Sequence, residues 1–229
     1  FEVVKQESSM ISLNIETKGK KEKISAHAVL VAAGIVGNLE GLGLEKIGIN
    51  TKSGMIVTND FCSTNVQNIF AIGDITSPPW LAHKASHEGV MVAEIIAGQG
   101  NVRPLKKEHI PGCTYSNPQI ASVGLTEDKA LELGCEIKIG SFPFLANGKA
   151  LAMGEDEGFI KTIFDKNTGE LLGAHMVGFE VTELIATFLV GKQLETTSEE
   201  LINTIFPHPT MSEMLHESVL SSEDKVIHL

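Results

Sequence analysis

Cysteine is scarce in this chain of 229 residues, and the cysteines present form no known pattern. The three of them, Cys62, Cys113 and Cys135, are odd in number, lie far apart and make no C-x-x-C spacing. The sequence therefore argues against a disulfide framework and predicts no metal site. We expect buried structural thiols in a reducing, intracellular compartment.

Long apolar runs and an excess of positive charge are also missing. No stretch approaches the roughly twenty apolar residues that span a bilayer, and we find no signal peptide. The formal net charge is −11, which argues against nucleic acid and anionic membrane surfaces as partners and would suit a basic protein. With 42% hydrophobic and 21% charged residues, the composition is globular. The length allows one large or two ordinary domains.

The first 34 residues alternate polar and apolar side chains in the manner of β-strands. Such patterns cover 1–4 and 11–15, a turn follows at 18–20, and Ala28–Gly34 is continuously apolar. The continuous run predicts a strand buried on both faces, ending at a glycine where a backbone can approach a ligand. The alternative is a core strand followed by a simple turn. Because the opening residues resemble the middle of a strand, we expect the chain to be a piece of a longer protein.

A second apolar run, Asn68–Ile72, leads into Gly73-Asp74. It predicts a strand that carries a carboxylate at its C-terminal end, where open α/β sheets bind cofactors. Asp74 there would accept hydrogen bonds from sugar or polyol hydroxyls, or alternatively it is a turn residue. Residues 81–97 predict a helix whose N-terminal amides suit a phosphate or an electron-rich ring edge. His83 at its start is either a ligand or a capping and packing residue.

The remainder of the chain predicts a separate domain after a linker at 104–109. Strand patterns lie at 120–124, 137–142, 158–165 and 171–177, and helix patterns lie at 126–134, at 181–190, after Ser198 and after His208. A group of strands followed by a group of helices favours an α+β domain with an antiparallel sheet.

Two prolines bracket one histidine near the end of the chain, in Pro207-His208-Pro209-Thr210-Met211-Ser212-Glu213. Pro209 keeps His208 out of the α region and suits a helix start, so the imidazole is held by stiff backbone. A carboxylate that accepts the second N–H of a general-base histidine fixes its tautomer, and Glu213 is the natural candidate. Alternatively, Glu213 belongs to a capping box and accepts an amide at the helix start. The spacing alone leaves both interpretations open.

The order of these motifs resembles the pyridine nucleotide-disulfide oxidoreductases. The resemblance rests on Ala71-Ile72-Gly73-Asp74, Leu81-Ala82-His83-Lys84-Ala85 and the histidine segment, and the last two most resemble the dihydrolipoamide dehydrogenase branch. The stretches 121–127 and 172–175 resemble the interface domain of that family. The resemblance covers essentially the whole chain, and it implies a cis peptide bond at His208-Pro209.

The resemblance implies cofactor roles for five residues. Asp74 would bind the ribityl chain of FAD, and Leu81, Ala82 and His83 would lie beside the flavin. Gly34 would end the NAD-domain segment, close to NAD.

The resemblance also implies a fold, a reaction and partners. The fold would combine an α/β remnant, with the tail of an NAD-binding domain in 1–34 and a returning FAD-domain segment in 35–104, and an α+β interface domain in 105–229. His208 would be the base that deprotonates dihydrolipoamide, oriented by Glu213, and electrons would pass through an enzyme disulfide and FAD to NAD. The implied partners are a second copy in a homodimer and the subunit-binding domain of an acyltransferase in a 2-oxo acid dehydrogenase complex. The compartment would be a bacterial cytoplasm or a mitochondrial matrix.

Three departures limit what this chain does by itself. Gly34-Ile35-Val36-Gly37-Asn38 stands where the family has Gly-Arg-Arg-Pro, no G-x-G-x-x-G occurs, and the cysteines form no C-x-x-x-x-C pair. We therefore expect the chain alone to be inactive and to hold FAD weakly or not at all. Two alternatives remain, a dimerisation and docking module and a relative of glutathione reductase.

Overall fold

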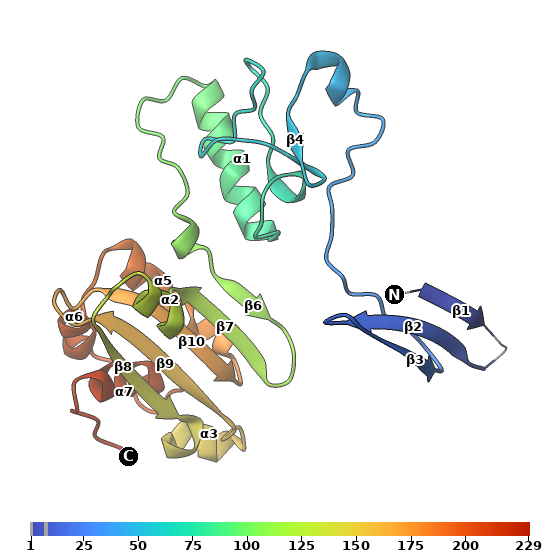
Figure 1. The fold of residues 1–229 in the computed structure, drawn as a ribbon. Helices are drawn as coiled ribbons and strands as arrows, with labels where there is room; N and C mark the ends of the chain where they lie inside the picture. The colour runs from blue at the N-terminus through green and yellow to red at the C-terminus, as the bar shows by residue number, and fades with distance from the viewer. Residues whose placement is uncertain (1, 7–8) are drawn as a thin grey trace. The chain divides into compact units, whose positions relative to one another are not determined.

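The computed structural model of the chain describes residues 2–6 and 9–229. The chain divides into two compact units, Phe1–Leu81 and Ala82–Leu229 (Figure 1). Phe1, which belongs to the first predicted strand, lies outside the described residues. Within the described ranges, no helix has both the length and the apolar character needed to cross a membrane.

The first unit begins with a three-stranded antiparallel sheet in the order β1-β2-β3. Its strands are β1 (Glu2–Gln6), β2 (Ile11–Thr17) and β3 (Lys20–Ala26). Lys18 and Gly19 join β2 to β3 with φ values of 51° and 77°. A two-residue turn with both φ values positive matches the right-handed twist of the strands it connects. The predicted turn at 18–20 is confirmed.

The apolar run Ala28–Gly34 is not a strand, so that prediction is wrong for this structure. The segment has no regular secondary structure, and Leu30 and Val31 are 91% and 61% exposed. A strand buried on both faces needs paired neighbours and covering layers, and no described strand pairs with this run. A run of this composition needs paired strands and covering layers, which the described residues do not provide.

The rest of the first unit has little regular structure. It contains η1 (Leu44–Ile47), the two-stranded hairpin of β4 (Thr51–Lys52) and β5 (Met55–Ile56), and η2 (Gly73–Ile75). The second predicted strand, 68–74, is also wrong, because only Phe70 makes an isolated bridge, to Ser63. A small core of Ile49, Ile56 and Ala71 holds this part together.

The second unit contains the predicted α+β domain with its antiparallel sheet. The five strands are ordered β6-β7-β10-β9-β8, and every neighbouring pair is antiparallel. Its elements are α1 (Ala82–Ile96), η3 (Lys107–His109), β6 (Gly112–Thr114), β7 (Gln119–Gly124), α2 (Glu127–Glu132), β8 (Ile137–Pro143), η4 (Phe144–Ala146), α3 (Gly148–Met153), β9 (Gly158–Asp165), β10 (Leu171–Gly178), α4 (Val181–Leu184), α5 (Ala186–Gln193), α6 (Ser198–Asn203) and α7 (Glu213–Ser222). The helix predicted at 181–190 is divided into α4 and α5.

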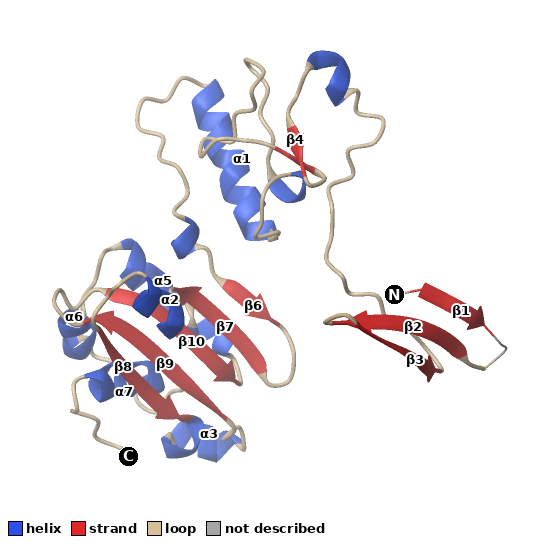
Figure 2. Ribbon diagram, in the orientation of Figure 1, coloured by secondary structure: helices blue, strands red, loops and turns tan. Residues whose placement is uncertain are grey.

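Helices cover both faces of this sheet (Figure 2). In β9, the Thr162 hydroxyl donates to the Ser218 carbonyl of α7 at 3.1 Å, whereas the next residue, Ile163, packs with Ala130 of α2. Because successive strand residues point to opposite faces, α7 and α2 lie on opposite sides of the sheet. The main core lies on the α7 side and includes Phe142, Phe164, Phe188, Met176, Met214 and Leu215.

Gly140 in β8 allows α7 to lie directly against the sheet. A Cβ atom at this position would meet the Ser218 carbonyl oxygen at 1.8 Å and the Ser222 nitrogen at 2.9 Å. Any side chain here would therefore push the helix away from the strand. Since Glu213 is the first residue of α7, this close contact also determines where Glu213 lies.

Candidate active site

The structure brings His208 and Glu213 into direct contact. His208 lies in the segment between α6 and α7, which we call the His208 loop (residues 207–212). Its Nδ1 lies 2.9 Å from Oε1 of Glu213, and the two side chains are 81% and 26% exposed. The peptide bond between His208 and Pro209 is cis, which confirms the prediction made from the resemblance.

The second oxygen of Glu213 binds the backbone of the same loop. The Thr210 amide donates to Oε2 of Glu213 at 2.8 Å, and the Thr210 hydroxyl donates to the Pro207 carbonyl at 2.6 Å. The capping box predicted at Thr210 is only half formed, because Glu213 accepts the Thr210 amide whereas the Thr210 hydroxyl binds Pro207 and Ser212. One carboxylate contacts both the imidazole and an amide donor, so this geometry fits both interpretations of Glu213.

The charge on Glu213 determines which nitrogen of the neighbouring imidazole carries the proton. Burial acts to raise the pKa of Glu213, but the hydrogen bonds from Thr210 and His208 and the charges of His208 and His228 outweigh it, and the pKa lies below its ordinary 4.5. An ionised carboxylate only accepts hydrogen bonds, so Nδ1 of His208 carries the proton. In the neutral ring, Nε2 is then the free base, on a side chain that is open to solvent.

The residues predicted to contact a cofactor lie in irregular chain, in a 3-10 helix and at the start of an α-helix. Gly34 lies in irregular chain with φ of 93°, and a Cβ there would meet nothing within 4 Å. Asp74 is exposed in η2, and its carboxylate fits a role as acceptor for polyol hydroxyls. Leu81 precedes α1, and Ala82 and His83 begin it, with no acidic residue in the first turn to offset the positive end of the helix.

His83 makes a contact that supports the packing alternative. Its Nε2 lies 2.9 Å from the Pro111 carbonyl, near the start of β6. This nitrogen therefore already has a partner within the second unit.

The three cysteines form no disulfide bond, and the described residues contain no group of three or more His, Cys, Asp or Glu side chains that could hold a metal ion. Cys62 is buried as predicted, whereas Cys113 and Cys135 are only half-buried. Burial, and next the charge of Glu183, raise the pKa of Cys113. Because the thiolate is the nucleophilic form, Cys113 is a poor candidate for thiol chemistry.

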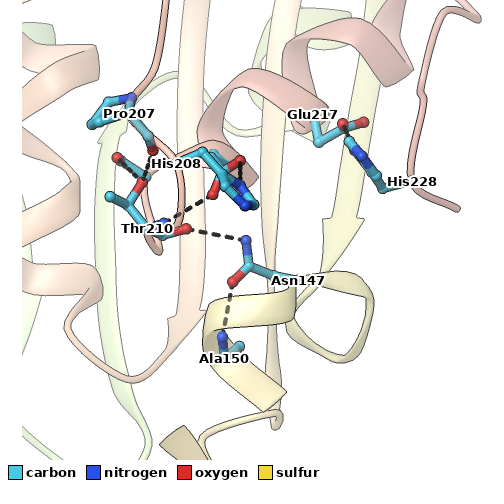
Figure 3. Close-up of polar contacts among 9 residues, drawn as sticks. Asn147, Ala150, Pro207, His208, Thr210, Glu217 and His228 are labelled. Atoms are coloured by element: carbon cyan, nitrogen blue, oxygen red, sulfur yellow. Dashed lines mark hydrogen bonds and ion pairs between the residues drawn. The ribbon is translucent and has the colours of Figure 1, made fainter. Parts of the chain in front are cut away.

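Asn147, which belongs to none of the sequence motifs, contacts the His208 loop. Figure 3 shows Asn147 between Ala150 and Thr210: its Oδ1 accepts from the Ala150 amide at 2.9 Å, and its Nδ2 donates to the Thr210 carbonyl at 3.2 Å. An asparagine before Gly148 is a recognisable helix cap. Nothing local in the sequence indicates a contact to a residue 63 positions away.

Glu217 is a second buried polar residue that belongs to none of the sequence motifs. Its side chain is 6% exposed, and its carboxylate accepts from the Ile227 amide at 3.0 Å and binds Nδ1 of His228 (Figure 3). This pair attaches the C-terminal segment to α7.

Comparisons with known proteins agree with the resemblance seen in the sequence. Residues 2–89 match the family described as pyridine nucleotide-disulphide oxidoreductase, and residues 110–219 match its dimerisation domain. A dihydrolipoyl dehydrogenase of Rhizobium etli is 56% identical over 98% of this chain and 47% of its own length, and one of Bacillus subtilis is 46% identical over 96% and 46%. The chain thus spans about half the length of the curated relatives that it matches.

A solved structure shares the fold. The Cu(II) complex of the HOCl-induced flavoprotein disulfide reductase RclA from Escherichia coli aligns with a TM-score of 0.83 at 25% identity, over 94% of this chain and 48% of that one.

Proposed function

Because this chain belongs to the pyridine nucleotide-disulphide oxidoreductase family, we propose that it is the C-terminal part of a dihydrolipoamide dehydrogenase. The proposed divisions are the tail of an NAD-binding domain in 1–34, a returning FAD-domain segment in 35–104 and an interface domain in 105–229. The relatives from Rhizobium etli and Bacillus subtilis, both named dihydrolipoyl dehydrogenase, support the choice of substrate.

The observation that carries the proposal is the exposed imidazole of His208 held by the half-buried carboxylate of Glu213. With Nδ1 protonated toward the carboxylate, Nε2 of His208 takes the proton from a thiol of dihydrolipoamide. The thiolate then attacks one sulfur of an enzyme disulfide, which forms a mixed disulfide and releases the other sulfur as a thiolate. Glu213 stabilises the imidazolium that results.

FAD and NAD are the proposed cofactors, and when bound they supply the two-electron acceptor chemistry. Asp74 would hold the ribityl hydroxyls, and Leu81, Ala82 and His83 would lie near the flavin ring. Gly34 is the proposed neighbour of NAD. The contribution of this chain is to present the base and to hold the proton at His208.

We propose that the partner at this site is a second copy of the longer protein of which this chain is the C-terminal part, in a homodimer. His208 is 81% exposed, and the chain contains no C-x-x-x-x-C pair, so the disulfide must come from elsewhere. The match of residues 110–219 to a dimerisation domain supports this arrangement. Three cysteines that form no disulfide bond favour a reducing compartment, for which we propose a bacterial cytoplasm or a mitochondrial matrix.

A substrate comparison tests the proposed branch of the family. The flavoenzyme that contains this chain should produce NADH from dihydrolipoamide and should not reduce glutathione disulfide. If glutathione disulfide were instead the better substrate, the glutathione-reductase-like alternative would replace the proposal.

The second candidate function is a dimerisation and docking module. The net charge of −11 favours it, because it complements a basic subunit-binding domain of an acyltransferase. We expect the isolated chain to show no turnover and to bind this domain with an affinity that falls as salt is added. An affinity that does not change with salt concentration would count against the docking function.

A further inference from the structure

Asn147 is held in a single orientation at a buried position. The residue is 6% exposed and lies between η4 and α3. Its side-chain oxygen accepts from the Ala150 amide, which only donates, so the NH2 group must point the other way, toward Thr210. Its own backbone amide donates to the Phe144 carbonyl at 2.9 Å, and its carbonyl accepts from the Leu151 amide at 3.1 Å.

Thr210 connects Asn147 to the candidate active site by hydrogen bonds. The Thr210 carbonyl accepts from Asn147 at 3.2 Å, and the Thr210 amide donates to Glu213 at 2.8 Å. The other oxygen of Glu213 binds His208 Nδ1 at 2.9 Å. A continuous series of hydrogen bonds therefore connects the start of α3 to the imidazole.

The His208 loop has few other ways to fix its backbone. Pro207 and Pro209 have no amide hydrogen to donate, and the remaining hydrogen bonds of the Thr210 side chain stay within the loop. Among the described residues, Asn147 makes the hydrogen bond that joins this loop to an element distant in sequence. The burial of Met211 anchors the loop as well, but an apolar contact does not orient a peptide group.

We propose that Asn147 is a positioning residue for His208, acting through Thr210 and Glu213. The inference rests on the proposed function, in which His208 is the base. The carbonyl that Asn147 binds belongs to the Thr210–Met211 peptide, and the amide that binds Glu213 belongs to the Pro209–Thr210 peptide. The two bonds are therefore coupled through the backbone dihedral angles of Thr210. Without the bond from Asn147 these angles are less restrained, and the amide aligns the carboxylate with the imidazole less well. Thiol oxidation then slows, whereas substrate binding is unaffected because Asn147 is buried.

Two substitutions separate this role from the capping of α3. Serine caps a helix as well as asparagine does but is too short to reach Thr210, so Asn147→Ser removes only the bond to the loop. Asn147→Ala removes both. Thr126→Ala is the matched control, because it removes the cap of α2, another six-residue helix, on the opposite face of the sheet.

The assay is steady-state and stopped-flow kinetics on the flavoenzyme that contains this chain. We expect both Asn147 variants to lower kcat for dihydrolipoamide oxidation about fivefold, equivalent to about 1 kcal/mol, with KM and flavin reduction by NADH unchanged. Thr126→Ala should keep the wild-type kcat. In a Glu213→Gln background, Asn147→Ser should have little further effect, because residue 213 then no longer accepts the proton of His208 Nδ1 and its alignment by Thr210 no longer prepares the base.

Either of two results would overturn the inference. A wild-type kcat for Asn147→Ser would limit Asn147 to capping α3. If Asn147→Ser lowered kcat by the same factor in the Glu213→Gln background, Asn147 would not act through Glu213. Failure of the proposed function is recognised separately, by a His208→Ala variant that oxidises dihydrolipoamide at the wild-type rate.

Discussion

Replacing Glu213 with glutamine reverses the hydrogen bonding of His208 at almost constant shape. The Thr210 amide, which donates to Oε2 of Glu213 at 2.8 Å, keeps the glutamine oxygen on its side, since two donors cannot face each other. The NH2 group of the glutamine then faces His208 Nδ1 across the 2.9 Å contact. Nδ1 must become the acceptor, and the proton moves to Nε2, the atom that has to receive the substrate proton.

The expected cost follows from the bond that is lost. A hydrogen bond to a charged group is worth about 1.5–3 kcal/mol, which corresponds to about a 10- to 150-fold loss of rate. Because the amide of Thr210 stays satisfied, the stability of α7 should change by less than about 0.5 kcal/mol.

The assay for Glu213→Gln is kcat/KM for dihydrolipoamide, with flavin reduction by NADH as the internal control. We expect the first rate to fall in the stated range and the second to stay unchanged. Glu213→Ala is the comparison, since it removes the contacts to both the imidazole and the amide. A wild-type rate in the glutamine variant combined with a slow alanine variant would refute the reasoning and leave Glu213 as an amide acceptor only.

Three further predictions concern the fold and the isolated chain. Gly140→Ala should lower the free energy of unfolding by about 1–3 kcal/mol because α7 must move away from β8. The control Gly148→Ala, whose Cβ would meet nothing within 4 Å, should leave the free energy of unfolding unchanged. Denaturant titration measures both variants, and equal stabilities would contradict the close packing of α7 on β8. The hydrogen bond and charge of Lys138, with help from Ser198, hold the pKa of Glu223 below 4.5 against its burial. Stability from Glu223 is therefore present above pH 4.5 and lost as the pH falls through the lowered pKa, so Glu223→Gln should cost about 1 kcal/mol at pH 7 and progressively less in acid; a cost independent of pH would refute it. The isolated chain should purify without flavin absorbance, and one flavin per chain would overturn that expectation.

Much of the sheet of the second unit could be predicted from the sequence because three of its four strand pairs, β6–β7, β8–β9 and β9–β10, join consecutive strands. β9 and β10 are joined by a tight turn at 167–169, in which the Asp165 carboxylate accepts the amides of Asn167 and Thr168. β7 and β8 alternate buried and less buried residues, whereas β10 is buried almost throughout. Local turn chemistry and periodicity were therefore sufficient for these consecutive pairs.

The two apolar runs of the first unit could not be placed in the same way. The pattern in Ala28–Gly34 requires neighbours on both edges and both faces, and periodicity does not say which residues provide them. The described residues form no such neighbours, so Leu30 and Val31 remain exposed. A composition typical of a central strand is therefore not enough to form one.

The contact between His208 and Glu213 could be predicted from the sequence, whereas the contact between Asn147 and Thr210 could not. His208 and Glu213 are five positions apart, so spacing and helix-capping rules indicated that the two could meet, but not that one carboxylate would serve both partners. Asn147 reaches Thr210 across 63 residues. A contact of that range depends on how α3 and α7 pack on the sheet, which the sequence alone does not reveal.

The two half-reactions of a His208→Ala variant test the account most directly. In the flavoenzyme that contains this chain, stopped-flow absorbance follows flavin reduction by dihydrolipoamide and, separately, by NADH. Loss of a general base predicts that the first rate falls by about 10²–10⁴-fold, while the second stays at the wild-type value. Wild-type rates in both half-reactions would contradict the assignment of His208 as the proton acceptor.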